Sequence, residues 1–88
     1  MTIEVHLFAT LARYLPPGSE HGHARVDVSD GATVEDLVRV LGIPDAMARV
    51  ALVNGCEAVP EARLAPSDVV TLFPPLAGGA YLNHRSGR

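Results

Sequence analysis

The 88-residue chain lacks lysine and tryptophan and contains a single cysteine, Cys56. One cysteine excludes an internal disulfide, and it also excludes a zinc or iron–sulfur site built from cysteine ligands. The absence of lysine leaves no side-chain amine that could accept an isopeptide bond. The ordinary explanation for this absence is a genome that encodes arginine in place of lysine. No apolar run approaches the roughly 20 residues that a membrane-spanning helix requires.

Basic residues are also few and scattered. The net charge is −3, and residues 1–79 carry ten acidic residues and five arginines, which gives −5 for that part of the chain. Nucleic acid is therefore not an expected partner, because phosphate binding requires clustered basic side chains. An acidic body suits a basic partner surface, or it serves solubility alone. The N-terminus begins with a strand pattern and not a signal peptide, so we expect a cytoplasmic protein without membrane contacts.

The length predicts one domain with a modest core. Hydrophobic residues make up 48% of the chain, which is enough to fold. A chain of this size buries only about 60–65% of its unfolded surface, so a deep enzymatic pocket is not expected. Size and composition thus favour a carrier or binding module over an enzyme.

The first third of the chain predicts two strands separated by a short helix. Residues 2–7 alternate between apolar and polar side chains, as in a half-buried strand. Residues 8–15 change to helical spacing and predict a short helix with an apolar face formed by Phe8, Leu11, Ala12 and Leu15. The segment Pro16-Pro17-Gly18 ends this helix. Residues 24–28 alternate again, and we expect this strand to pair antiparallel with the first.

The clearest helix lies in the middle of the chain. Thr33 is its expected N-cap, with Asp36 as a weak capping-box partner, and Gly42 is its expected C-terminal stop. An apolar stripe at helical spacing runs between them, formed by Val34, Leu37, Val38 and Leu41.

The second half predicts three further strands. Residues 50–53 are apolar throughout, which indicates a central strand, and a short helical turn at residues 45–48 precedes them. Asn54-Gly55 predicts a hairpin to a short strand at residues 56–59. Residues 69–73 form the last strand. These elements predict an α+β domain, with a mixed sheet of four to five strands packed on one main helix.

The most informative segment follows the last strand and reads Phe73-Pro74-Pro75-Leu76-Ala77-Gly78-Gly79. The two prolines cannot continue a sheet ladder and favour an extended backbone. The side chains then become smaller toward the glycines, which lack a Cβ and can pass through a narrow channel. From Phe73 to Gly79 the extended chain would reach roughly 23 Å, at about 3.3 Å per residue. Such a tail could enter the active site of a partner.

This segment closely resembles the C-terminus of the ubiquitin-like sulfur carriers, the family of the MoaD-type molybdopterin synthase small subunit and the ThiS-type thiamine carrier. The segments Leu7-Phe8-Ala9-Thr10-Leu11 and Val53-Asn54-Gly55 are also similar to family sequences, so the resemblance covers residues 3–79. It implies the β-grasp (ubiquitin-like) topology, in which the first and last strands are parallel neighbours at the centre of the sheet.

The resemblance also implies a function as a protein co-substrate and not an enzyme. Gly79 would carry the acyl-adenylate and then the thiocarboxylate, Gly78 would give access, and residues 73–77 would guide the tail into a partner. The implied partners are an adenylating enzyme that uses ATP, a sulfur donor and a molybdopterin synthase large subunit. No cofactor would be bound permanently. Carriers for thiamine, cysteine or siderophore-type chemistry, and protein modifiers, share the final glycine pair and remain alternatives. One cysteine excludes a β-grasp ferredoxin.

The chain continues past the glycine pair, which departs from the family pattern. Gly79 is joined to Ala80 by an amide bond, so it has no carboxylate to activate. We expect residues 1–79 to form the domain and residues 80–88 to form a flexible extension. Three explanations of the extension remain open. A metalloprotease removes it by cleavage between Gly79 and Ala80, or it is a tail that a binding module retains, or it is an artificial addition.

Other candidates give weaker signals. His21 and His23 flank Gly22, but two ligands without nearby cysteine or acidic residues favour a solvated loop, so no metal site is predicted. His6 is expected to be an exposed strand residue, and Cys56 a small half-buried one. Leu76 has no expected core partner, which favours an interface contact.

Overall fold

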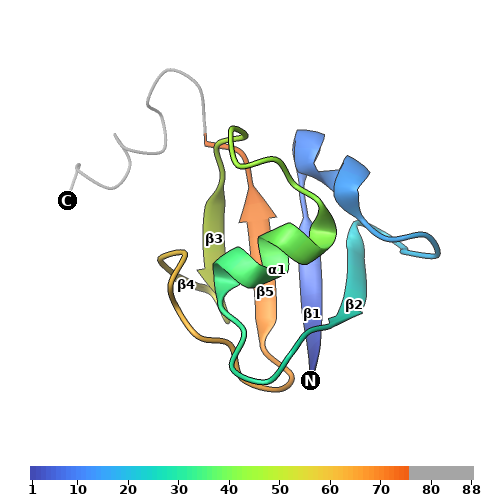
Figure 1. Cartoon of the computed structure of the whole chain (residues 1–88). Helices are drawn as coiled ribbons and strands as arrows, with labels where there is room; N and C mark the ends of the chain where they lie inside the picture. The colour runs from blue at the N-terminus through green and yellow to red at the C-terminus, as the bar shows by residue number, and fades with distance from the viewer. Residues whose placement is uncertain (76–88) are drawn as a thin grey trace.

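A computed structural model describes residues 1–75, and residues 76–88 lie outside the described part. Within residues 1–75, five strands form one sheet, and one α-helix packs across one side of it (Figure 1). The elements in chain order are β1 (Thr2–Leu7), a 3₁₀ helix (Ala9–Tyr14), β2 (His23–Asp27), α1 (Val34–Leu41), β3 (Val50–Val53), β4 (Cys56–Glu57) and β5 (Val69–Phe73). The predicted α+β class is confirmed.

The sheet has the strand order β2-β1-β5-β3-β4. Its first and last strands in the chain, β1 and β5, are parallel neighbours, as the β-grasp topology requires. The other pairs, β1 with β2, β3 with β5 and β3 with β4, are antiparallel. Because β1 and β5 run in the same direction, their C-terminal ends lie at the same end of the sheet (Figure 1).

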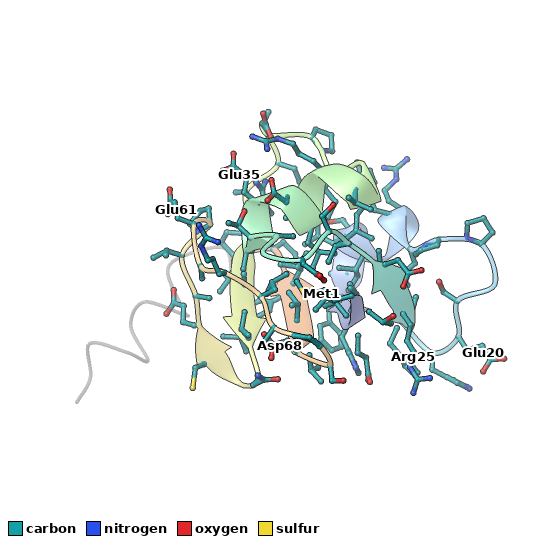
Figure 2. All side chains as sticks on the ribbon, turned by 60° about the horizontal axis from the view of Figure 1, so that its bottom comes forward. Met1, Glu20, Arg25, Glu35, Glu61 and Asp68 are labelled. Carbon is teal, nitrogen blue, oxygen red and sulfur yellow. The ribbon has the colours of Figure 1, made fainter. Side chains whose placement is uncertain are left out.

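The core lies between α1 and the sheet. The alternate residues Ile3, Val5 and Leu7 of β1 and Val70 and Leu72 of β5 are almost fully buried there. On α1, the predicted stripe is buried against them: Val34, Leu37, Val38 and Leu41. The resulting separation of the two sides of the sheet is visible in Figure 2, where Glu35 lies on the helix side and Arg25 points away from it.

The side of the sheet away from α1 is called the open face below. Strand alternation and register place on it Thr2, Glu4, His6, His23, Arg25, Asp27, Val50, Leu52, Val69, Thr71 and Phe73. All of these side chains are half-buried or exposed. A partner can therefore contact the side chains of the open face on β1, β2, β3 and β5.

The caps of α1 match the sequence prediction. The Thr33 hydroxyl accepts a hydrogen bond from the Asp36 amide at 3.2 Å, and the Asp36 carboxylate accepts one from the Thr33 amide at 3.0 Å. At the other end, Gly42 adopts the left-handed conformation (φ 82°) and its amide donates to the carbonyls of Arg39 and Val38. A glycine is suited to this position because other residues are strained at positive φ.

The predicted helix at residues 8–15 differs from the structure. Phe8 is still extended (φ −116°, ψ 157°), its amide donates to the Leu72 carbonyl at 3.1 Å, and the 3₁₀ helix begins only at Ala9. Leu11 is fully buried and Leu15 packs on the core, as expected, but Phe8 is 52% exposed. The prediction that Phe8 shares one apolar helical face with Leu11 and Leu15 is wrong, because Phe8 is still extended and strand alternation sets the direction of its side chain.

Three smaller expectations also change. The segment at residues 45–48 is a turn, with a hydrogen bond from the Met47 amide to the Pro44 carbonyl, and not a helix. β3 lies between β5 and β4, so it is internal but not at the centre, and its residues are all half-buried. β4 has two residues where four were expected. In residues 1–75, no helix is long and apolar enough to cross a bilayer.

Candidate functional site

The last strand, β5, ends at the upper end of the sheet in Figure 1, where the C-terminal end of β1 also lies. Its final residues are paired on both sides, Leu72 with Leu7 and Phe73 with Val50. Pro74 follows immediately, and a proline has no amide hydrogen with which to extend the ladder. Pro74 is half-buried and Pro75 is exposed. The chain therefore leaves the sheet at Phe73, as the sequence predicted.

The start of β5 is fixed by Asn54, which sequence analysis assigned only to a hairpin turn. Asn54 and Gly55 have φ of 53° and 86°, as the predicted two-residue turn requires. In addition, the Asn54 side-chain oxygen accepts a hydrogen bond from the Val69 amide at 2.9 Å, and its Nδ2 donates to Asp68 at 3.0 Å. The hairpin turn thus holds the first residue of the strand that leads to the tail. The dipeptide pattern gave no signal of this contact.

Apolar side chains surround the point where the chain leaves the sheet. Val50 lies directly opposite Phe73, and Leu52 lies next along β3 on the same face. Phe8 continues the alternation of β1 after His6, so its exposed ring also lies on the open face at this edge. The apolar surface formed by Phe8, Val50, Leu52 and Phe73 is named the exit surface.

A polar cluster lies farther along the open face. The Nε2 atom of His6 is 2.7 Å from Oε2 of Glu4, and the rings of His6 and His23 are stacked with centroids 5.0 Å apart. The hydrogen bond with His6 holds the pKa of Glu4 below its ordinary value of 4.5, and the positive charge of Arg25 acts in the same direction. The open face therefore combines an apolar exit surface with a charged region beside it.

The structure changes the interpretation of the histidines and of Cys56. His23 is the first residue of β2 and not part of a loop, and it lies directly opposite His6. His6 is half-buried and hydrogen-bonded, whereas it was expected to be exposed. Cys56 was expected to be half-buried, but it is exposed at the hairpin. The contact between His6 and His23 depends on the register of β1 and β2, which sequence spacing does not reveal.

The residues with predicted chemical roles lie beyond the described part of the chain. They are Leu76, Ala77, Gly78, Gly79 and Ala80. The structure thus places Phe73, Pro74 and Pro75 of the predicted tail segment, and the roles of all these residues remain predictions.

Comparison with known proteins supports a ubiquitin-like identity. Residues 1–78 match the family model described as Mut7-C ubiquitin. SAMP1 from Haloferax volcanii, also named small archaeal modifier protein 1, has a similar structure (TM-score 0.67) and is 32% identical over 90% of this chain and 100% of that chain. No curated protein sequence matches the chain.

Two more distant structures have the same fold. One is assigned as molybdopterin converting factor subunit 1 from Pyrococcus furiosus, at 21% identity over 85% of this chain and 98% of that chain, with a TM-score of 0.67. The other is from the complex of subunits 1 and 2 of the molybdopterin-converting factor from Helicobacter pylori, at 18% identity over 90% of this chain and 100% of that chain, with a TM-score of 0.59.

The fold and these matches define a small ubiquitin-like protein with a β-grasp sheet. The chain belongs to the Mut7-C ubiquitin family.

Proposed function

We propose that the chain is a sulfur carrier whose Gly79 carboxylate, freed by removal of residues 80–88, becomes a thiocarboxylate that supplies sulfur, most directly to molybdopterin biosynthesis. The observation that carries this proposal is the position of β5. A strand at the centre of the sheet ends at Phe73, and the sequence Pro74-Pro75-Leu76-Ala77-Gly78-Gly79 follows it directly. A rigid body thus carries a narrow C-terminal segment, which suits delivery into a partner's active site.

The chemistry begins with the bond between Gly79 and Ala80. Hydrolysis of this amide by a protease consumes one water and leaves a carboxylate on Gly79. A carboxylate oxygen then attacks the α-phosphorus of ATP in an adenylating enzyme, and pyrophosphate leaves. A sulfur nucleophile at the oxidation level of hydrosulfide displaces AMP from the acyl carbon and leaves a thiocarboxylate. Gly79 suits these steps because no side chain crowds the reacting carbon.

The partner enzymes supply every catalytic group in this scheme, and the protein supplies recognition. Its exit surface lies at the edge of the sheet from which the tail leaves, so a partner that covers Phe8 and Val50 would also receive the tail. Phe8 is exposed and the other apolar side chains of this surface are half-buried, and a group of accessible apolar side chains is typical of protein interfaces. In this proposal the protein acts in the cytoplasm as a co-substrate, and the sulfur transfer itself uses no cofactor bound to the chain.

A second function is favoured by the similarity to SAMP1, which is named a modifier protein. The same Gly79 acyl-adenylate could be attacked by an amine of another protein in place of sulfur, with an amide bond as the product. Carrier and modifier share the cleavage and adenylation steps, and they differ in the nucleophile that displaces AMP. A binding module that keeps residues 80–88 would perform neither reaction.

Reconstitution with the adenylating enzyme of the same host tests the carrier function. The chain ending at Gly79 is incubated with this enzyme, ATP and hydrosulfide, and the product is identified by intact mass. The expected product has one oxygen replaced by sulfur, and full-length chain is the matched control, expected to remain unchanged because its Gly79 has no carboxylate. Failure of the Gly79-terminated chain to form either an adenylate or a thiocarboxylate would contradict the proposal.

A further inference from the structure

The first two strands of the chain, β1 and β2, bring three potential metal ligands together on the open face. The donor atoms of Glu4, His6 and His23 all lie within 4.8 Å of one another. His6 and His23 are directly opposite each other on β1 and β2, and Glu4 precedes His6 by two residues on the same face. Of the residues described, these three form the one group of this kind. We propose that Glu4, His6 and His23 bind a divalent transition-metal ion, with zinc as the best-matched ion.

The donor types fit zinc. Two imidazoles and one carboxylate are a common zinc ligand set, and three protein ligands leave a fourth tetrahedral position for water or another ligand. Zinc bonds of about 2.0–2.1 Å place tetrahedral ligand atoms roughly 3.4 Å apart. The donor atoms lie within 4.8 Å of one another, and Glu4 Oε2 and His6 Nε2 are 2.7 Å apart, so we expect small side-chain rotations to bring them to this separation.

The backbone holds these donors in place. Five consecutive residue pairs join β1 and β2, and β1 is paired with β5 on its other side. The side chains are half-buried, so they are restrained by their neighbours but remain accessible from solvent. The Glu4–His6 contact shows that both side chains already point toward a common position. Binding therefore requires little ordering, which favours affinity.

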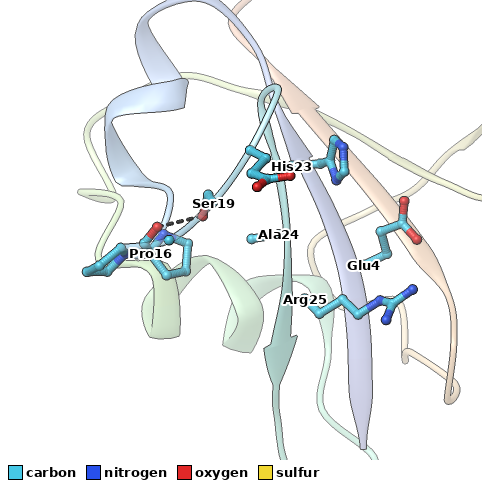
Figure 3. Close-up of a pocket in the computed structure, with 9 residues that line it drawn as sticks. Glu4, Pro16, Ser19, His23, Ala24 and Arg25 are labelled. Atoms are coloured by element: carbon cyan, nitrogen blue, oxygen red, sulfur yellow. Dashed lines mark hydrogen bonds between the residues drawn. The ribbon is translucent and has the colours of Figure 1, made fainter.

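A hollow adjoins two residues of the cluster, Glu4 and His23. Its volume is about 490 Å³, and its lining includes Glu4, His23 and Arg25 together with residues 16–20 (Figure 3). In Figure 3 the side chains of Glu4 and His23 extend to the same side of the two strands. Arg25 lies opposite Glu4 in the ladder, but no ion pair within 4.0 Å joins them in residues 1–75. The Glu4 carboxylate is hydrogen-bonded to His6, and a metal ion bound by both side chains would replace this contact.

The four histidines of the chain allow a matched test by zinc titration. ZnCl₂ alone is added to the full-length protein in a non-chelating buffer, and stoichiometry and affinity are measured by calorimetry. The variant with His6→Gln and His23→Gln lacks the histidines of the cluster. The control with His21→Gln and His84→Gln lacks the other two. Circular dichroism and the Tm without metal verify that both variants fold.

The wild-type protein and the control are expected to bind one zinc ion per chain with a Kd below about 100 µM. The His6/His23 variant should bind at least about 100-fold more weakly, and Glu4→Gln at least about tenfold more weakly. NMR of the imidazole nitrogens should show zinc-dependent shifts at His6 and His23. No saturable binding by the wild-type protein, or equal binding by the two double variants, would overturn the proposal.

Discussion

Val50 lies directly opposite Phe73 in the antiparallel ladder between β3 and β5, and Phe73 is the last residue of that ladder before Pro74. This pair fixes the point at which the chain leaves the sheet. It also places two apolar side chains on the open face beside that point. The body of the protein and the beginning of the tail are therefore presented to a partner as one rigid surface.

The exit surface should be required for partner binding. Phe8→Ala removes its most exposed ring, and we expect roughly tenfold weaker binding to the adenylating enzyme, because aromatic side chains dominate many interfaces. The Tm should change little, since Phe8 is 52% exposed. Calorimetry or biolayer interferometry measures the affinity.

Val40→Ala is the matched control for this variant. Val40 is 58% exposed and lies on α1, on the other side of the molecule from the open face. It should bind the enzyme as the wild-type protein does. Equal losses of affinity in the two variants would place the binding surface elsewhere.

Asn54 should contribute measurably to stability through the start of β5. Asn54→Ala removes its two side-chain hydrogen bonds and puts a less suitable residue at φ 53°, so we expect a loss of about 1–2 kcal/mol in the free energy of unfolding. Asn54→Gly loses the same hydrogen bonds without the backbone strain and should lose less. Urea unfolding compares the two. A larger loss in Asn54→Gly than in Asn54→Ala would contradict this account of the turn.

The capping box of α1 should make stability depend on pH. The hydrogen bond from the Thr33 amide holds the pKa of Asp36 below its ordinary value of 3.8. At low pH the unfolded chain therefore binds more protons than the folded protein. The stabilisation is complete above the pKa that Asp36 has in the unfolded chain, and it is lost as pH falls through the pKa that Asp36 has in the folded protein. Urea unfolding between pH 2 and pH 6 should show this loss in the wild-type protein, and Asp36→Asn should reduce it.

Two further variants separate the cap from a general charge effect. Asp45→Asn removes the same charge from an exposed turn outside the helix and should retain the wild-type slope of stability against pH. Thr33→Ala removes the other half of the capping box and should cost about 1 kcal/mol at neutral pH. A wild-type slope in Asp36→Asn would show that the cap does not cause the pH dependence.

The sequence predicted the elements whose signals are local. Thr33 and Gly42 define α1 through side-chain and backbone chemistry that acts within one helical turn, and Asn54-Gly55 defines a hairpin in the same way. The alternation of β1 likewise identified its buried residues. The parallel pairing of β1 with β5 came from the resemblance to a family, since periodicity alone does not order strands in a sheet.

Features that depend on register or on the end of an element could not be predicted in this way. Phe8 lies at the change from strand to 3₁₀ helix, where either periodicity fits, and a difference of one residue reverses its exposure. The contact between His6 and His23 depends on the register of two strands that are separated in the chain by residues 8–22. The tail was predicted from its sequence alone, so its chemistry requires a direct measurement.

That measurement is the intact mass of the protein purified from its own host. The account predicts a chain that ends at Gly79, with a fraction in which sulfur replaces one oxygen of the terminal carboxylate. Recovery of only the full-length chain ending at Arg88, even when the host's processing protease is present, would contradict it.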